Sequence, residues 1–229
     1  MVTFISTVAF LLSLLFPQGA VRIPDPGGSH SGSGHTFTDV NGTNFSCSSS
    51  PCAITYTSTS GYLLVITFGN LAVGNFITAL TGGGTWTIPS GCLVTASVSM
   101  SCAYIISNKG ATSFSLSYGT GTGTGTLFEW SYTGTGSVVV DGTPATASDA
   151  TSTTQTMISP SITGTSDLVV QGIQINTGSS IRSFSGGYTV DEQGGTRGQV
   201  HLTNTANMTA PVAHLSGTSK AEICELAFK

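Results

Sequence analysis

The sequence predicts an all-β protein, a two-sheet antiparallel β-sandwich, and three observations support this class. Charged residues make up only 7% of the 229 residues, against about a quarter in ordinary soluble domains. The polar surface is therefore built from Thr, which favours strands, and from Ser, Gly and Asn, which favour turns. After residue 20 no stretch carries apolar residues at helical spacing over three turns, so little helix is expected.

Short strand-like segments follow one another at the spacing typical of a sandwich, about 8–12 residues. In chain order they read CAITYTS, GYLLVITFG, TWTIP, CLVTASVS, CAYIIS, TSFSLSY, LFEWSYT, SVVVD, DLVVQGIQI, SFSGGYTV, GQVHLTN, APVAHLS and AEICELAF. Each is bounded by Gly, Pro, Asn or Ser. Because all-β sandwiches commonly exceed ~200 residues as one unit, residues 36–229 are expected to form a single domain.

The first 20 residues have the layout of a secretory signal. An apolar run, Val8–Phe16, precedes Pro17 and the small residues Gly19 and Ala20, which is the order of the apolar region and cleavage site. No Lys or Arg precedes the run, so a retained apolar arm is the alternative. The run is short for a membrane span, which needs about 20 residues. Residues 21–35, rich in Pro, Gly and Ser, are expected to form a flexible leader.

The five cysteines suit an oxidising compartment. Cys47 and Cys52 flank the turn-forming SSSP, which predicts a disulfide between them, and Cys92 and Cys102 are expected to form a second one. Four cysteines permit three connectivities, so the pairing stays open. Cys224 shares strand parity with apolar residues, which favours a buried inert thiol over an intermolecular bridge. The chain has no C-x2-C spacing, so no zinc site is expected at the cysteines.

A weak internal repeat divides the domain. The segment SPCAITYTSTSGYLLVITFGN, from Ser50, resembles SPSITGTSDLVVQGIQIN, from Ser159. A unit of about 105 residues used twice would give a sandwich of pseudo-symmetric halves, with each half supplying strands to both sheets. Chance similarity between low-complexity β sequences is the alternative.

A family resemblance rests on the order of several motifs. These are SPCAIT…LLV, TWTIPSG, CAYI, TSFSLS, FEWSYTG, VDGTPATA…SPSITGTSDLVV and the terminal AFK. In this order the chain resembles the jelly-roll, lectin-like domains of secreted bacterial proteins and of some phage structural proteins, over residues 36–229. The resemblance implies a two-sheet sandwich displayed outside the cell. It brings no catalytic residues to transfer.

The segment GTGTGTGT, residues 119–126, admits three interpretations. In the first it is a loop or a thin strand at a sheet edge, where Gly allows the backbone to bend. In the second, strand alternation places all four Thr on one face and all Gly on the other, so that a backbone or a sugar ring could lie on the glycine side. In the third, the threonines form an ice-binding surface. Such a surface needs similar rows on adjacent strands, and the sequence has only this one. The Thr side chains of this expected assembly edge are Thr120, Thr122, Thr124 and Thr126.

Two glutamates are candidates for catalysis. Glu129 and Glu225 each stand between apolar residues in strand-like segments, and two carboxylates about 5–5.5 Å apart are the arrangement of a retaining glycan hydrolase. Strand parity opposes this, because it sends Glu129 outward while its aromatic neighbours point inward. A nucleophilic triad of Ser and His is not expected either, because the sequence has no G-x-S-x-G motif to present the serine. We therefore expect no enzyme activity.

Carboxylates occur in two fragments of calcium-binding loops. Asp39 begins DVNGT, and Asp191 and Glu192 begin DEQGG, whereas a calcium site needs clustered oxygen ligands. The fragments leave structural calcium as an open alternative, and no other cofactor is expected. His201 and His214 lie in strand-like contexts that favour half-buried, hydrogen-bonded roles.

The leading functional hypothesis is a secreted structural or adhesive subunit that self-associates through low-charge sheet edges. The runner-up is a carbohydrate-binding module, and a glycan hydrolase comes third. The six basic residues are scattered, so no nucleic-acid partner is expected. The stacking candidates for a sugar are Trp86, Trp130, Tyr132 and Tyr188.

Overall fold

The computed structural model describes residues 34–229 except 95, 161, 163–167 and 204–208. The expected signal segment, and the leader up to residue 33, lie outside the described residues. The strands of the first half are β1 (Thr36–Cys47), β2 (Cys52–Ser58), β3 (Leu63–Asn70), β4 (Ile77–Thr81), β5 (Leu93–Val94), β6 (Ser99–Ile105), β7 (Ala111–Tyr118) and β8 (Gly123–Thr133). Those of the second half are β9 (Ala145–Thr156), β10 (Leu168–Ile175), β11 (Ile181–Ser185), β12 (Thr189–Gly194), β13 (Arg197–Leu202) and β14 (Val212–Phe228). One 3-10 turn, η1 (Ser90–Cys92), precedes β5.

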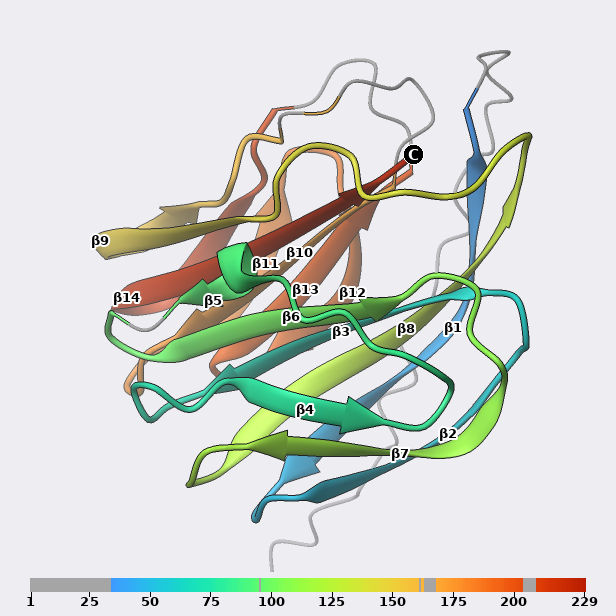
Figure 1. The fold of residues 1–229 in the computed structure, drawn as a ribbon. Coiled ribbons are helices and arrows are strands. Elements are labelled where there is room, and N and C mark those ends of the chain that lie inside the picture. The colour runs from blue at the N-terminus through green and yellow to red at the C-terminus, as the bar shows by residue number, and fades with distance from the viewer. Residues whose placement is uncertain (1–33, 95, 161, 163–167, 204–208) are drawn as a thin grey trace, which may run out of the picture.

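The all-β sandwich class is confirmed, but the described strands form three antiparallel sheets rather than two (Figure 1). The middle sheet has the order β1-β8-β3-β6-β5. The small sheet, β2-β7-β4, covers one of its faces. The large sheet has the order β11-β14-β10-β13-β12, with β9 added on β14, and covers the other face. The middle sheet is therefore the central layer of three.

The three layers enclose three apolar cores. The core between the middle and large sheets contains Trp130 and Phe228, both fully buried. The core between the middle and small sheets contains Phe68 and Phe114. The third core belongs to the large sheet alone, because the ends of this sheet approach each other: the Ile181 N–H donates to the Gly195 carbonyl at 2.9 Å. The large sheet thus curls around its own outer core.

The middle and large sheets repeat one strand order, which agrees with the expected pseudo-symmetric halves. In the middle sheet, β1 pairs with β8, β8 with β3, β3 with β6 and β6 with β5. In the large sheet, β9, β14, β10, β13 and β12 pair in the same sequence. The expectation that each half supplies strands to both sheets was wrong. The first half instead builds the middle and small sheets and the second half builds the large sheet, and in each half the first and last strands pair with each other.

The two strand orders run in opposite directions across the sandwich. β3 and β6 pack on β10 and β14, and β5 packs beside β9 and β14. At the other end, β1 faces β12, since Asp39 and Asp191 approach each other there. The edge strand β1 of the middle sheet and the edge strand β9 of the large sheet consequently lie at opposite ends of the molecule (Figure 1).

Candidate functional site

A polar interior lies between the middle and large sheets, at the end where β1 faces β12. Alternate residues of β13 point toward the middle sheet, as strand geometry requires, and in this strand they are Arg197, Gln199 and His201, all at least 98% buried. The middle sheet contributes Thr67 and Thr126, also fully buried. Buried polar groups of this kind must be hydrogen-bonded to be tolerated.

The hydrogen bonds of the polar interior form a chain from sheet to sheet. Thr67 donates its hydroxyl to Gln199 Oε1, and Gln199 donates Nε2–H to Asp191 Oδ2 at 3.0 Å. Asp191 Oδ1 lies 2.6 Å from His201 Nδ1. The His201 ring meets the Trp130 ring edge-on, with centroids 5.8 Å apart. These contacts fix the carboxylate of Asp191 and the imidazole in one arrangement.

Arg197 is the buried cation of this region. Its guanidinium pairs with Glu192 and contacts Thr126 Oγ1, and it donates to Thr67 Oγ1 at 3.0 Å. Burial lowers the pKa of Arg197 to about 9, so the group stays charged at neutral pH. Glu192 supplies the opposite charge that a buried cation needs.

Asp39 of β1, Asp191 of β12 and His201 of β13 form a cluster that was not predicted from the sequence. Donor atoms of Asp39, Asp191 and His201 all lie within 4.8 Å of one another. Both aspartates stand where strand pairing is interrupted, in β1 between Asp39 and Asn41 and in β12 between Val190 and Glu192. A β-bulge re-aims a side chain. Asp191 is turned inward beside exposed Val190, and Asp39 is half-buried beside exposed Val40.

The Gly-Thr run was expected at an edge, and this was wrong. Only its start, through Thr122, lies in an exposed turn. From Gly123 the chain is β8, which pairs with β1 on one side and β3 on the other. A Cβ on Gly123 would lie 2.1 Å from the Phe68 ring, and one on Gly125 would lie 2.0 Å from the Phe45 ring. The alternation is thus a literal strand whose glycine face is covered by aromatic rings.

The opposite face of the same run carries the threonines. Thr126 is fully buried and contacts Arg197 and Glu192, and Thr124 is half-buried. Thr120 and Thr122 are exposed. Of the four threonines, only Thr126 therefore belongs to the polar interior, and the strand part of the run lies inside the middle sheet instead of at its edge.

The disulfide pattern agrees with the sequence in one pair and differs in the other. Cys47 and Cys52 are bonded as predicted, with 5.4 Å between their Cα atoms. Cys102 is bonded to Cys224, not to Cys92, so the expected pair Cys92–Cys102 and the inert thiol at Cys224 were both wrong. The bonded pair joins β6 of the middle sheet to β14 of the large sheet, a contact between layers that sequence spacing does not show.

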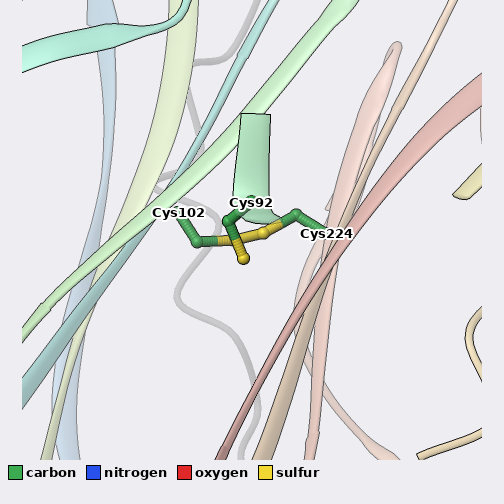
Figure 2. Close-up of side chains that lie close together, drawn as sticks. All are labelled: Cys92, Cys102 and Cys224. Atoms are coloured by element: carbon green, nitrogen blue, oxygen red, sulfur yellow. A yellow bond between two sulfur atoms is a disulfide. The ribbon is translucent and has the colours of Figure 1, made fainter. Parts of the chain in front are cut away.

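Figure 2 shows the third sulfur of this group beside the bridge. The sulfurs of Cys92, Cys102 and Cys224 lie within 4.8 Å of one another, and all three residues are fully buried. Cys92 donates its S–H to the Glu225 carbonyl oxygen at 3.2 Å. Burial, and secondarily the charge of Glu225, raises the pKa of the Cys92 thiol, which keeps it protonated and unreactive.

The two candidate catalytic glutamates point away from each other. Glu129 accepts from the Tyr56 hydroxyl at 2.8 Å and from the Thr59 N–H, between the middle and small sheets. Glu225 accepts from Gln171 Nε2 at 2.6 Å, in the outer core of the large sheet. The core between the middle and large sheets separates them. They do not form the facing pair that glycan hydrolysis requires.

Glu225 has an unusual environment of its own. Burial raises the pKa of Glu225 to about 8, although the hydrogen bond from Gln171 opposes the shift. Burial, and secondarily the charge of Glu225, also raises the pKa of Tyr188. Gln171 is held in turn by both backbone groups of Ile158. Glu225 is thus a buried carboxyl that is neutral at pH 7.

The four candidate sugar-stacking residues do not share a surface. Trp130 is fully buried beside His201, and Tyr188 is 9% exposed in the outer core of the large sheet. Trp86 is partly exposed and donates to the Gly82 carbonyl, with its ring against Phe114. Tyr132, also partly exposed, packs on the other side of the middle sheet. Carbohydrate binding stays a prediction.

Part of the polar interior could have been found from the sequence. The alternation Arg197-x-Gln199-x-His201 in a β segment places three polar side chains on one face, and that signal was missed. Asp39 and Asp191 were noted as calcium-loop fragments, but 152 residues separate them. Nothing in the sequence indicates that they meet.

Comparison with known proteins found no matching family model, no matching curated protein and no matching solved structure. The resemblance to jelly-roll, lectin-like domains therefore stays a prediction. Within the part of the chain that the structure describes, no helix has the length and apolarity needed to cross a membrane.

Proposed function

We propose that the chain is an extracellular structural subunit that associates with further copies of itself through its strand edges. One observation carries the proposal: the middle and large sheets end at opposite sides of the molecule in the edge strands β1 and β9. Each has 12 residues and, among the described strands, pairs with one neighbour. Such edges present unpaired backbone N–H and C=O groups to another chain.

The sequences of the two edges support this role. Neither TFTDVNGTNFSC nor ATASDATSTTQT contains Lys, Arg or Pro, the residues with which soluble proteins block an edge. At about 3.3 Å per residue, each strand offers roughly 40 Å of backbone. Regular pairing is interrupted in β1 at Asp39 and in β9 between Asp149 and Thr154. The longest regular segments therefore run from Asn41 to Cys47 in β1 and from Ala145 to Asp149 in β9.

The arrangement of the edges favours an open chain of subunits. A contact between β1 of one copy and β9 of the next joins two different surfaces, and such heterologous contacts repeat without closing unless the rotation happens to form a ring. The two disulfides suit an oxidising compartment outside the cell. Low surface charge, with weak self-repulsion, favours association.

The test is the assembly state of the purified chain with its disulfides formed. We expect light scattering and negative-stain microscopy to show polymers that grow with concentration. The double variant Thr151→Lys, Thr153→Lys places two charges at exposed positions of β9 and should reduce polymer at least ~10-fold. Its matched control, Thr112→Lys with Thr177→Lys, adds the same charge at exposed positions outside β1 and β9 and should polymerise normally.

Two outcomes would contradict the proposal. One is a monodisperse monomer for the unmodified chain at every concentration tried. The other is an equal loss of polymer in the control variant, which would show that net charge and not the β9 edge governs association. Circular dichroism of each variant confirms that the β fold is retained before assembly is compared.

A further inference from the structure

We propose that Asp39, Asp191 and His201 form a binding site for a divalent transition-metal ion, with Zn²⁺ the best match, which clamps β1 to the large sheet. Two carboxylates and one imidazole present donor atoms within 4.8 Å of one another. A tetrahedral zinc ion at 2.0–2.2 Å from each ligand would hold the donor atoms about 3.3 Å apart. Asp191 Oδ1 and His201 Nδ1, which lie 2.6 Å apart, would separate by about 0.7 Å to reach that spacing.

The donor set selects the type of ion. Ca²⁺ and Mg²⁺ prefer oxygen ligands alone, whereas imidazole suits Zn²⁺ and its neighbours in the first transition row. The two aspartates of the calcium-loop fragments therefore suit a transition-metal ion better than Ca²⁺, because His201 adds a nitrogen ligand to the same cluster. Two carboxylates would balance both charges of the ion. Three protein ligands leave the fourth tetrahedral position to a water molecule.

The surroundings hold the donor groups as a metal site requires. Gln199 Nε2 donates to Asp191 Oδ2 at 3.0 Å, while Asp191 Oδ1 faces His201 Nδ1 at 2.6 Å. Outer hydrogen bonds of this type orient the ligands of known metal sites. Asp39 is half-buried, so it connects the otherwise buried cluster to solvent and gives an ion a way in.

A second observation beside the cluster points to an additional ligand. The indole Nε1–H of Trp130 is fully buried and has no hydrogen-bond partner among the described residues. Trp130 is paired across the strands with Asp39 and packs against the His201 ring. A buried donor without an acceptor lowers the stability of the fold. A water or hydroxide bound to the metal would be an acceptor for this N–H.

The position of the site gives it a structural role. The disulfide Cys102–Cys224 ties β6 of the middle sheet to β14 of the large sheet. The metal site would tie the same two sheets at the end where β1 faces β12 and β13. An ion that binds only the folded chain stabilises it by mass action. The inference is independent of the proposed self-association.

The experiment compares EDTA-treated protein with and without added Zn²⁺, Mn²⁺ or Ca²⁺. We expect one equivalent of Zn²⁺ by metal analysis after desalting, and a melting temperature about 5–10 °C higher at a ~100-fold excess over Kd. Mn²⁺ should bind more weakly, in the order of intrinsic affinities, and Ca²⁺ should give no shift. The intrinsic fluorescence of Trp130, which touches His201, should change on binding.

Two variants and one control make the test specific. His201→Gln and Asp39→Asn should each weaken Zn²⁺ binding at least ~10-fold and abolish the thermal shift. Asp39 is half-buried, so Asp39→Asn is expected to fold even if His201→Gln does not. His214→Gln removes a partly exposed imidazole that bonds to Ser185 and lies outside the cluster, and it should bind zinc normally. Equal binding by Asp39→Asn and the unmodified protein, or no bound zinc at all, would overturn the site and leave an Asp191–His201 hydrogen bond.

Discussion

The middle and large sheets share a strand order but close their outer faces in different ways. The middle sheet is covered by a separate layer, β2-β7-β4, over an apolar core. The large sheet has no such layer among the described strands, and it curls until β11 reaches β12. The strand order thus fixes the sandwich, and the segments between the shared strands decide what covers it.

The reason lies in the connections. In the first half, β2 precedes β3 and β7 separates β6 from β8, and together with β4 they form the small sheet. In the second half, β10 follows β9 and β14 follows β13 without a further described strand. β11 pairs with β14 and so stays in the large sheet. Lacking a covering layer, the large sheet buries polar groups such as Gln171 and Glu225 in its outer core.

The largest expected difference between regions concerns the two disulfides. Loop-closure entropy predicts that the Cys102–Cys224 bridge, with a separation of 122 residues, stabilises the fold by about 5 kcal/mol, and that the Cys47–Cys52 bridge, with a separation of 5, gives about 2 kcal/mol. Replacing each pair with Ala, in a Cys92→Ala background that prevents substitute pairing, should reproduce this order in urea unfolding.

The control for the disulfide comparison is the Cys92→Ala protein itself, with both bridges intact. Equal losses for the two pairs would contradict the view that the bridge between the sheets is the stronger constraint. Retention of Cys92 should soften the loss in Cys224→Ala, because the sulfur of Cys92 lies within 4.8 Å of that of Cys102.

A second comparison sets the Gly-Thr run of β8 against a glycine in the large sheet. Gly125→Ala would place a methyl group 2.0 Å from the Phe45 ring, whereas Gly194→Ala in β12 meets nothing within 4 Å. Overpacking of this kind costs about 2–3 kcal/mol, and an unobstructed Gly→Ala change in a strand costs little. Chemical unfolding of both variants measures the difference. Equal stability would show that Phe45 moves aside freely.

Sequence reasoning succeeded where one face of a strand is buried. CAITYTS was predicted as a strand and is β2, residue for residue, because apolar and polar residues alternate in it. The sequence missed β1 and β9, which have few apolar residues because they are edges rich in Thr, Ser and Asn. TWTIP and SVVVD were predicted as strands, yet each contributes only an isolated bridge, at Thr87 and Val140.

The candidate site shows a different limit. Residue types in β13 mark its inward face, but the meeting of Asp39 with Asp191 depends on how two sheets stack. The partner of Cys102 depends on the same stacking. Spacing along the chain favoured Cys92, ten residues away, as the disulfide partner of Cys102. Such spacing carries no information about contacts between sheets. Local pattern predicts elements, whereas contacts between sheets need the fold.

The third comparison concerns the two glutamates. Glu129 accepts two hydrogen bonds, from the Tyr56 hydroxyl and the Thr59 N–H. Glu129→Gln replaces one accepting oxygen with an NH₂ group, so the Tyr56 hydroxyl loses its acceptor and must turn to accept instead, a cost of about 1 kcal/mol. Glu225→Gln at pH 6 should instead raise the unfolding free energy by up to ~2 kcal/mol, because Gln copies the protonated acid and retains an oxygen for Gln171, whereas Glu225 ionises in the unfolded chain above pH 4.5. Unfolding free energies at pH 6 distinguish them, and a larger loss for Glu225→Gln would reverse our interpretation.

Glu225 also makes the unfolding free energy depend on pH, and expressed per pH unit this is the smallest effect. Burial raises the pKa of this carboxyl from 4.5 to about 8, so between these values the unfolded chain has released a proton that the folded chain still holds. Stability must then fall as pH rises, by at most ~1.4 kcal/mol per pH unit. The contribution is complete below pH 4.5 and lost above pH 8. Glu225→Gln has no proton to lose, so its unfolding free energy should decline less steeply than that of the unmodified protein across this window. Parallel curves for the two proteins would show that Glu225 titrates alike in the folded and unfolded chains, and the polar outer core of the large sheet would then be as well solvated as its surface.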